Sequence, residues 1–182
     1  NGCLNQYDTL LSLLHHRLPY LKNAGIILKL YQSSAIAVTS NSKNIQINSY
    51  QANYNHAIAM KNYLDKKINK YVTGVFLHGS LGTNELVQYS DFDALVILNH
   101  STFNSKQSLI NVATTLKKSE RIMQKMDPLQ HHGWFILIEK ELNDFPTSYF
   151  PPSLFEYAKC LMGNNRFQIH FQNPSNVTKL QL

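Results

Sequence analysis

Two short apolar segments, joined through a glycine-serine turn and a pair of aspartates, limit the possible folds of this chain more than any other feature. The first segment covers residues 72–77 and leads into Gly79-Ser80; the second starts at Asp91 and runs to Leu98. Short apolar runs bounded by turn residues predict buried strands, and a run that is apolar on both faces indicates a central strand. We therefore expect a covered sheet, with the turn and the aspartates at the ends of two successive strands.

Helical periodicity on both sides of this block provides the layers that would cover the sheet. Apolar side chains recur every three or four positions in several segments, which predicts amphipathic helices. The elements predicted outside the two strands are helices over 4–18, 54–70, 106–126 and 154–162, a helix followed by a loop or short hairpin over 25–48, a helix of about two turns after Ser80 through 85–87, a strand over 133–139 and an edge strand over 167–171. Together they predict an α/β (α+β) fold in which helices flank a small mixed sheet.

We expect three regions along the chain. Residues 1–70 form an N-terminal helical region, and residues 71–145 form the core sheet. Residues 146–182 form a C-terminal helix and edge segment that packs with the core as one unit. The chain begins at Asn1 without a methionine, which is compatible with a piece of a longer protein.

Composition narrows the classes of protein. The 182 residues are 43% hydrophobic, which is enough for one packed domain and argues against a disordered chain. A formal net charge of +6 suits partners that carry phosphate, although solubility alone explains such a balance. No apolar run approaches the ~18 residues of a membrane span and no signal-peptide pattern opens the chain, so we expect a cytoplasmic protein without membrane contact. Cys3 and Cys160 match no metal-finger spacing and are expected to be reduced thiols.

Each residue type at the two strand ends has a chemical use. Gly79 lacks a Cβ, so the backbone can approach a ligand closely, and the exposed amides of a following helix favour an anion. Ser80 adds a hydroxyl donor. Asp91 and Asp93 are two positions apart, so on a strand both carboxylates project from one face while Phe92 turns into the core. Two carboxylates on one face attract Mg²⁺, which prefers oxygen ligands.

The segment from Gly79-Ser80 to Asp91-Phe92-Asp93 resembles the signature of the DNA polymerase beta-like nucleotidyltransferase superfamily, which includes kanamycin nucleotidyltransferase. That signature is a hydrophobic residue, glycine and glycine or serine, then a spacer and two acidic residues around a hydrophobic one. The likeness extends over roughly residues 72–139. The resemblance implies the nucleotidyltransferase fold and transfer of a nucleoside monophosphate from a nucleoside triphosphate to a hydroxyl acceptor. It also implies that Asp91 and Asp93 hold Mg²⁺ or Mn²⁺ and that Gly79 and Ser80 hold the outer phosphates.

The chain departs from this pattern on the third predicted strand, where active members usually carry another carboxylate. No acidic residue occupies the start or middle of residues 133–138, and His132 is nearest to the expected position. A neutral imidazole there completes the metal site or serves as a base; alternatively, it is part of a solvated entry to the strand. Asp127 and Glu139 remain candidates, although Asp127 is also explained as a helix terminus with Pro128.

Other features carry less weight. His78 either faces the nucleotide or is a packed histidine, and Trp134 is expected in the core rather than on a stacking platform. A basic stripe of Lys118, Arg121 and Lys125 is typical of any solvated helix face. Aromatic and basic residues are not interleaved, so we expect no dedicated nucleic-acid binding.

Three hypotheses for the function follow. The leading one is a magnesium-dependent nucleotidyltransferase that modifies a hydroxyl of a small molecule or a protein, because the chain is short for the duplex-holding domains of a polymerase. The second is a nucleotide-binding regulatory module that has lost turnover together with the third carboxylate. The third is an antitoxin-like interaction protein, for which an exposed apolar patch would be the structural sign.

Overall fold

A five-stranded mixed sheet forms the centre of the part of the chain that the computed structural model describes, which is residues 39–173 without 89 and 148–149. From one edge to the other, its strands are β2 (Asn48–Ser49), β6 (Lys159–Gly163), β3 (Val72–Leu77), β4 (Ala94–Leu98) and β5 (Phe135–Ile138). β3 runs antiparallel to both neighbours, whereas β2 is parallel to β6 and β4 is parallel to β5. The predicted α/β fold with a mixed sheet is confirmed.

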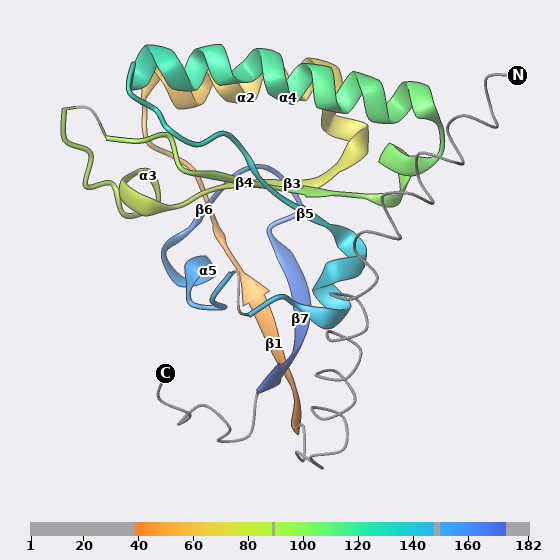
Figure 1. Ribbon diagram of the computed structural model, residues 1–182. Helices are drawn as coiled ribbons and strands as arrows, with labels where there is room; N and C mark the ends of the chain where they lie inside the picture. Colours follow the sequence, from red (N-terminus) through yellow and green to blue (C-terminus); the bar gives the residue numbers. More distant parts are fainter. Residues whose placement is uncertain (1–38, 89, 148–149, 174–182) are drawn as a thin grey trace, which may run out of the picture. The chain divides into compact units, whose positions relative to one another are not determined.

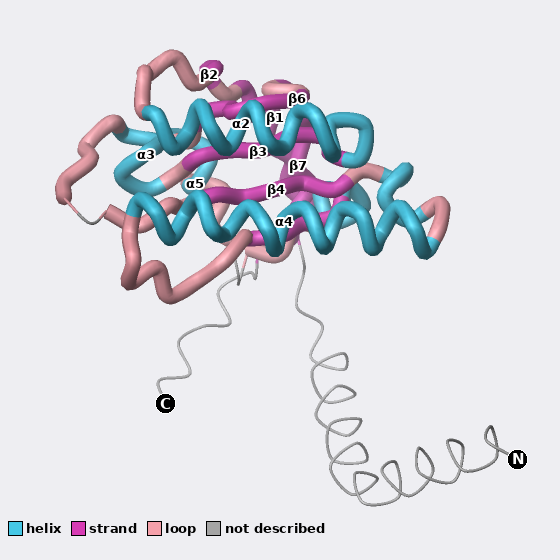
Figure 2. Tube along the Cα trace, turned by 90° about the horizontal axis from the view of Figure 1, so that it is seen from above, coloured by secondary structure: helices cyan, strands magenta, loops and turns pink. Residues whose placement is uncertain are grey.

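Helices α2 (Asn55–Ile68) and α4 (Lys106–Met126) lie side by side over one face of this sheet (Figure 1; Figure 2). Val75 and Leu77 of β3 and Val96 of β4 point toward these helices and belong to the same apolar cluster. The period of two along a strand sends the intervening side chains to the opposite face. The helices contribute to this cluster Ala57, Met60, Leu64, Val112, Leu116 and Met123.

The opposite face packs against a second apolar cluster that is rich in aromatic side chains. Phe76 of β3 and Leu95 and Ile97 of β4 belong to it. The covering residues come from a two-stranded sheet of β1 (Thr39–Gln46) and β7 (Arg166–Asn173), from the 3-10 helix η3 (Glu139–Asp144) and from the one-turn helix α5 (Leu154–Tyr157). Because both faces are covered, β3 and β4 are buried along most of their length, which explains their continuous apolar runs.

The ends of the two long helices follow from local chemistry. The Ser105 hydroxyl accepts a hydrogen bond from the amide of Ser108 at 3.0 Å and so caps the start of α4. Pro128 lies just beyond the end of α4, where a proline cannot continue the helix. Lys66 and Lys67 lie in the last turn of α2, where positive charge is favourable. The helices predicted over 54–70 and 106–126 are confirmed as α2, which ends at Ile68, and α4.

Two predictions fail where the chain forms strands instead. The loop or short hairpin predicted near residues 41–48 is wrong, because β1 pairs with β7 and β2 pairs with β6 rather than with each other. The helix predicted over 154–162 is wrong in its second half. Only α5 is helical, and residues 159–163 form β6, an inner strand whose backbone bonds β2 and β3.

The segment between β3 and β4 also differs from the expectation. Helix α3 (Gly79–Thr83) ends at Asn84, whose φ of +62° is left-handed, and does not continue through 85–87. β4 begins at Ala94, so the two aspartates lie in the segment that leads into the strand.

The remaining elements agree with the sequence. The predicted strand over 133–139 is β5, which lies at an edge of the sheet, and the strand over 167–171 is part of β7. The helices predicted over 4–18 and from residue 25 lie outside the described residues.

Two further observations bear on composition. None of the helices in the described part of the chain combines the length and the apolar character needed to cross a bilayer. Cys160 is a free buried thiol, as predicted, and burial raises its pKa. Cys3 lies outside the described residues.

Phe76→Ala should lower the free energy of unfolding by about 3–5 kcal/mol, because the fully buried ring packs edge-on against Phe155. Ile136→Ala, on the exposed part of β5, is the matched control and should cost about 1 kcal/mol or less. Urea unfolding followed by circular dichroism measures both variants. Equal losses would contradict the position of Phe76 in the second core.

Candidate active site

The chain turns sharply between β3 and α3, and this turn brings Gly79 against the carboxylate of Asp93. Gly79 has a φ of +57°, a left-handed conformation that other residues rarely adopt. A Cβ at this position would collide with Oδ2 of Asp93, so the glycine backbone and the carboxylate face each other directly. The amide of His78 also donates a hydrogen bond to the backbone oxygen of Asp93, at 3.1 Å. Both the backbone conformation and the approach of Asp93 therefore require glycine.

The two aspartates flank a phenylalanine just before β4. Phe92 is fully buried in the helix-side core, as the sequence predicts. The side chains of Asp91 and Asp93 keep exposed fractions of 31% and 24%. The burial of Phe92 thus leaves a carboxylate on each side of it within reach of solvent, although this segment is not itself a strand.

Two adjacent histidines approach the aspartates from the segment before β5. Nε2 of His132 lies 3.1 Å from Oδ1 of Asp93 and 3.8 Å from Oδ2 of Asp91. Nδ1 of His131 lies 3.7 Å from the same oxygen of Asp91. Because β4 and β5 are parallel neighbours, the residues that precede the two strands meet at one end of the sheet.

The side chain of Gln130 ties His132 to the backbone between the aspartates. Its Oε1 accepts a hydrogen bond from the amide of Phe92 at 2.7 Å, and its Nε2 lies 3.5 Å from the Phe92 carbonyl oxygen. The same Nε2 donates to the backbone oxygen of His132 at 3.0 Å and lies 3.2 Å from Nδ1 of that ring. Gln130 therefore bonds a backbone peptide in both directions, as a neighbouring strand would, and sets the position of His132.

The ring of His132 has partners for either neutral tautomer. Nδ1 lies 3.2 Å from the backbone oxygen of Gly133, which accepts a proton carried there and leaves the Nε2 lone pair facing the aspartates. With the proton on Nε2, the ring donates to Asp93 and Nδ1 accepts from Gln130. The imidazole can thus present either a lone pair or a proton to the carboxylates.

The environment of Asp93 favours a bound cation. Burial raises the pKa of Asp93, the charge of Asp91 acts in the same direction, and His132 opposes both. Desolvation and like charge both penalise the ionised carboxylate. A cation between the two aspartates would offset both penalties.

The donor atoms of the cluster fit a divalent metal ion. One ligand atom from each of Asp91, His131 and His132 lies within 4.8 Å of the others. Asp93 adds a second carboxylate beside His132. Carboxylate oxygens suit Mg²⁺ and Mn²⁺ and imidazole nitrogens suit transition ions, so the mixed set fits Mn²⁺ at least as well as Mg²⁺.

His78 belongs to the wall of this cluster. Its ring centroid lies 5.4 Å from that of Phe135, whose ring lies 5.1 Å from His132. Nε2 of His78 is buried without a hydrogen-bond partner among the described residues. Burial, and to a lesser degree the charge of His132, lowers the pKa of His78 to about 4. His78 is therefore a packed neutral imidazole at neutral pH.

Asp127, Glu139 and Trp134, the other residues considered from the sequence, lie outside the cluster in structural positions. Asp127 is buried and its Oδ1 accepts a hydrogen bond from the amide of Leu129 at 2.9 Å, which forms the turn after α4. Glu139 follows β5 at the end of the strand far from the histidines. The indole nitrogen of Trp134 donates to Ser119 at 2.9 Å and its ring packs on the helix-side core, as predicted.

Gly79, Asp91, Asp93 and His132, all predicted as site residues, lie in one cluster. Ser80, the next residue of α3, lines an open cleft together with Gly79.

The sequence analysis missed Gln130 and His131. Both precede β5, and their place beside the aspartates follows from the parallel pairing of β4 with β5. A prediction of which strands are neighbours would have found them.

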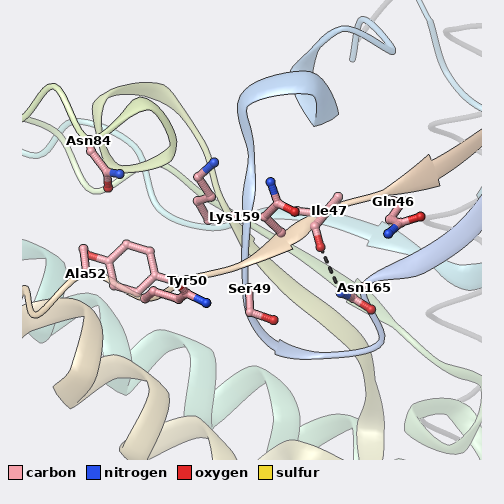
Figure 3. Close-up of a pocket in the computed structure, with 10 residues that line it drawn as sticks. Gln46, Ile47, Ser49, Tyr50, Ala52, Asn84, Lys159 and Asn165 are labelled. Atoms are coloured by element: carbon pink, nitrogen blue, oxygen red, sulfur yellow. Dashed lines mark hydrogen bonds between the residues drawn. The ribbon is translucent and has the colours of Figure 1, made fainter.

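A separate polar cavity of about 530 Å³ lies at the β2 edge of the sheet. Figure 3 shows the side chains of Tyr50, Asn84 and Lys159 around it, and Asn165, which donates a hydrogen bond to the backbone oxygen of Ile47 at 2.9 Å. Neither aspartate lines this cavity, so it is distinct from the cluster.

Comparison with known proteins identifies one family over this region. A profile of the nucleotidyltransferase domain family matches residues 59–155, more than half of the chain and every residue of the cluster. Among solved structures, the chain is similar to a protein from Sulfolobus solfataricus that is provisionally assigned as a nucleotidyltransferase. The two share 14% identity at a TM-score of 0.27, over 47% of this chain and 73% of that one. No curated protein matches the chain.

Gln130→Ala should weaken Mn²⁺ binding about 10- to 100-fold, because His132 loses the amide that orients it. Isothermal titration calorimetry measures the affinity. Gln107→Ala is the matched control, since its amide donates a hydrogen bond to Asn111 on the exposed surface of α4, away from the cluster. An unchanged affinity in Gln130→Ala would exclude this positioning role.

Acidification should destabilise the metal-free protein through His78. Its pKa is depressed from 6.5 to about 4, so its contribution to stability is present above pH 6.5 and is lost as the pH falls toward 4. The expected loss between pH 7 and 5 is about 2 kcal/mol. Urea unfolding with chelator at both pH values should show this loss in the wild type and in the exposed-site control His100→Gln, and a smaller one in His78→Gln. An equal loss in His78→Gln would rule out His78 as the source.

Proposed function

Because the chain belongs to the nucleotidyltransferase domain family, we propose that it transfers a nucleoside monophosphate from a nucleoside triphosphate to a hydroxyl acceptor and releases pyrophosphate. The observation that carries the proposal is the direct approach of the Gly79 backbone to the carboxylate of Asp93. A phosphate held by the turn would lie beside the carboxylates. The two functions that nucleotidyl transfer requires, phosphate binding and metal binding, would then meet at one point.

The predicted site residues divide the roles in this reaction. The backbone of Gly79 and the hydroxyl of Ser80 bind the outer phosphates. Asp91 and Asp93 hold Mg²⁺ or Mn²⁺, with His132 in the position of a third ligand. A divalent ion bound there polarises phosphoryl oxygens and neutralises the charge that develops on them.

The reaction is an in-line displacement at the α-phosphorus. The acceptor oxygen forms a bond to the α-phosphorus, while the bond between this phosphorus and the oxygen of the leaving pyrophosphate breaks. The acceptor proton passes to solvent while Nε2 of His132 binds the ion. If the ion is held by the aspartates alone, Nε2 instead accepts this proton, in the tautomer that carries the ring's own proton on Nδ1. The acceptor is a hydroxyl of a small molecule or of a protein.

A second function, a nucleotide-binding module without turnover, is favoured by one observation. In the described part of the chain, the position beside the two aspartates is occupied by His132 rather than by a third carboxylate. An imidazole adds no negative charge, so the site attracts a second cation less strongly than three carboxylates would. Nucleotide binding without transfer would support this function.

Wild-type protein should transfer label from at least one α-labelled nucleoside triphosphate in the presence of Mg²⁺ or Mn²⁺, and Asp93→Asn should reduce the rate at least about 100-fold. The substitution removes charge with almost no change in volume. Label incorporated into small-molecule hydroxyls or into proteins of a cell lysate is measured by chromatography and electrophoresis. Asp65→Asn, on the exposed surface of α2, is the control and should react as the wild type does. Equal rates in Asp93→Asn and wild type would remove Asp93 from the mechanism.

A further inference from the structure

A cleft of about 530 Å³ opens beside the Gly79-Ser80 turn, between α3 and the segment 151–157. This volume lies within the range of small-molecule sites. The lining has two parts of different character. One part is polar and consists of the turn with Thr83 and Glu85. The other is a mainly apolar wall formed by Pro151, Leu154 and Tyr157, with Ser153 as its polar member. A nucleotide has the same division, since its phosphates are polar and its base has flat apolar faces.

Tyr157 is the exposed aromatic residue of this wall. Tyr157 is 65% exposed, whereas Phe155, two positions earlier, is buried in the second core. A large exposed aromatic at the edge of a cleft has apolar surface that a ligand can cover.

The backbone of Tyr157 is held close to α3. A Cβ at Gly82 would lie 2.6 Å from the carbonyl oxygen of Tyr157, closer than real Cβ contacts allow. Gly82 is buried, so α3 and the end of α5 meet backbone to backbone. Gly82, three positions after Gly79, therefore sets the distance between the Gly79-Ser80 turn and the apolar wall.

We propose that this cleft binds the nucleobase of the substrate, with the base stacked on Tyr157 and the phosphates at Gly79-Ser80. The inference rests on the proposed function, because it takes a nucleoside triphosphate as the substrate. Glu85 also lines the cleft, and its amide donates a hydrogen bond to the backbone oxygen of Ser80 at 3.0 Å, so it lies next to the turn. The cavity of Figure 3 has the same volume, but neither Gly79 nor Ser80 lines it, so a base there would lie apart from its phosphates.

The test compares two ligands that differ by the presence of a base. Calorimetry with Mg²⁺ measures the Kd of α,β-methylene ATP, which cannot transfer its nucleotide, and of inorganic tripolyphosphate. Tyr157→Ala should weaken binding of the analogue about 5- to 100-fold and leave the Kd of tripolyphosphate unchanged. Tyr157→Phe keeps the stacking face and should bind both ligands as the wild type does. Phe103→Ala, an exposed aromatic in η2 (His100–Phe103), is the control and should change neither Kd.

The outcomes separate this inference from the proposed function. Equal weakening of both ligands in Tyr157→Ala would overturn the inference, because it would show damage to the turn rather than loss of stacking. Unchanged binding of both ligands would overturn it too, since the base would then lie elsewhere. If the variants behave as expected and wild type transfers no label, the base site stands and the proposed transfer fails. If label is transferred and Tyr157→Ala binds the analogue normally, the transfer stands and the base site fails.

Discussion

The contact between the Gly79 backbone and the Asp93 carboxylate joins the two halves of the site. It depends on a left-handed glycine at the end of β3 and on the hydrogen bond from His78 to the backbone oxygen of Asp93. These features bring the end of one strand to the start of its antiparallel neighbour. A side chain at position 79 would separate them. The placement of the Gly79-Ser80 turn over the carboxylates thus follows from one missing Cβ and one backbone hydrogen bond.

The histidines change the electrostatics of this arrangement. A neutral His132 beside the aspartates adds no charge, so the formal charge of the cluster is that of the two carboxylates alone. The site therefore repels an approaching triphosphate less than three carboxylates would, and it attracts cations less strongly. Gln130 compensates in geometry, because its amide bonds the Phe92 peptide and the His132 backbone together. The third position of the site is consequently set by hydrogen bonding as well as by charge.

The second face of the sheet links the core to the candidate nucleotide cleft. Phe76 and Phe155 pack in the same aromatic cluster that anchors α5. The buried Phe155 and the exposed Tyr157 belong to the same short helix, and Gly82 allows that helix to approach α3. Core packing on this face therefore determines where the apolar wall of the cleft lies relative to Gly79.

The sequence by itself determined the elements whose pattern is local. Apolar runs predicted β3 and β4, helical periodicity predicted α2 and α4, and residue chemistry pointed to the turn and the aspartates. Tertiary structure decided the rest. Residues 48–49 and 159–163 are strands because they pair with segments far along the chain. The free energy of this pairing depends on those distant segments and not on the local sequence alone, so no local pattern predicts it. Gln130 and His131 reached the aspartates for the same reason: the parallel pairing of β4 with β5, which no residue type encodes, puts the segments before the two strands side by side.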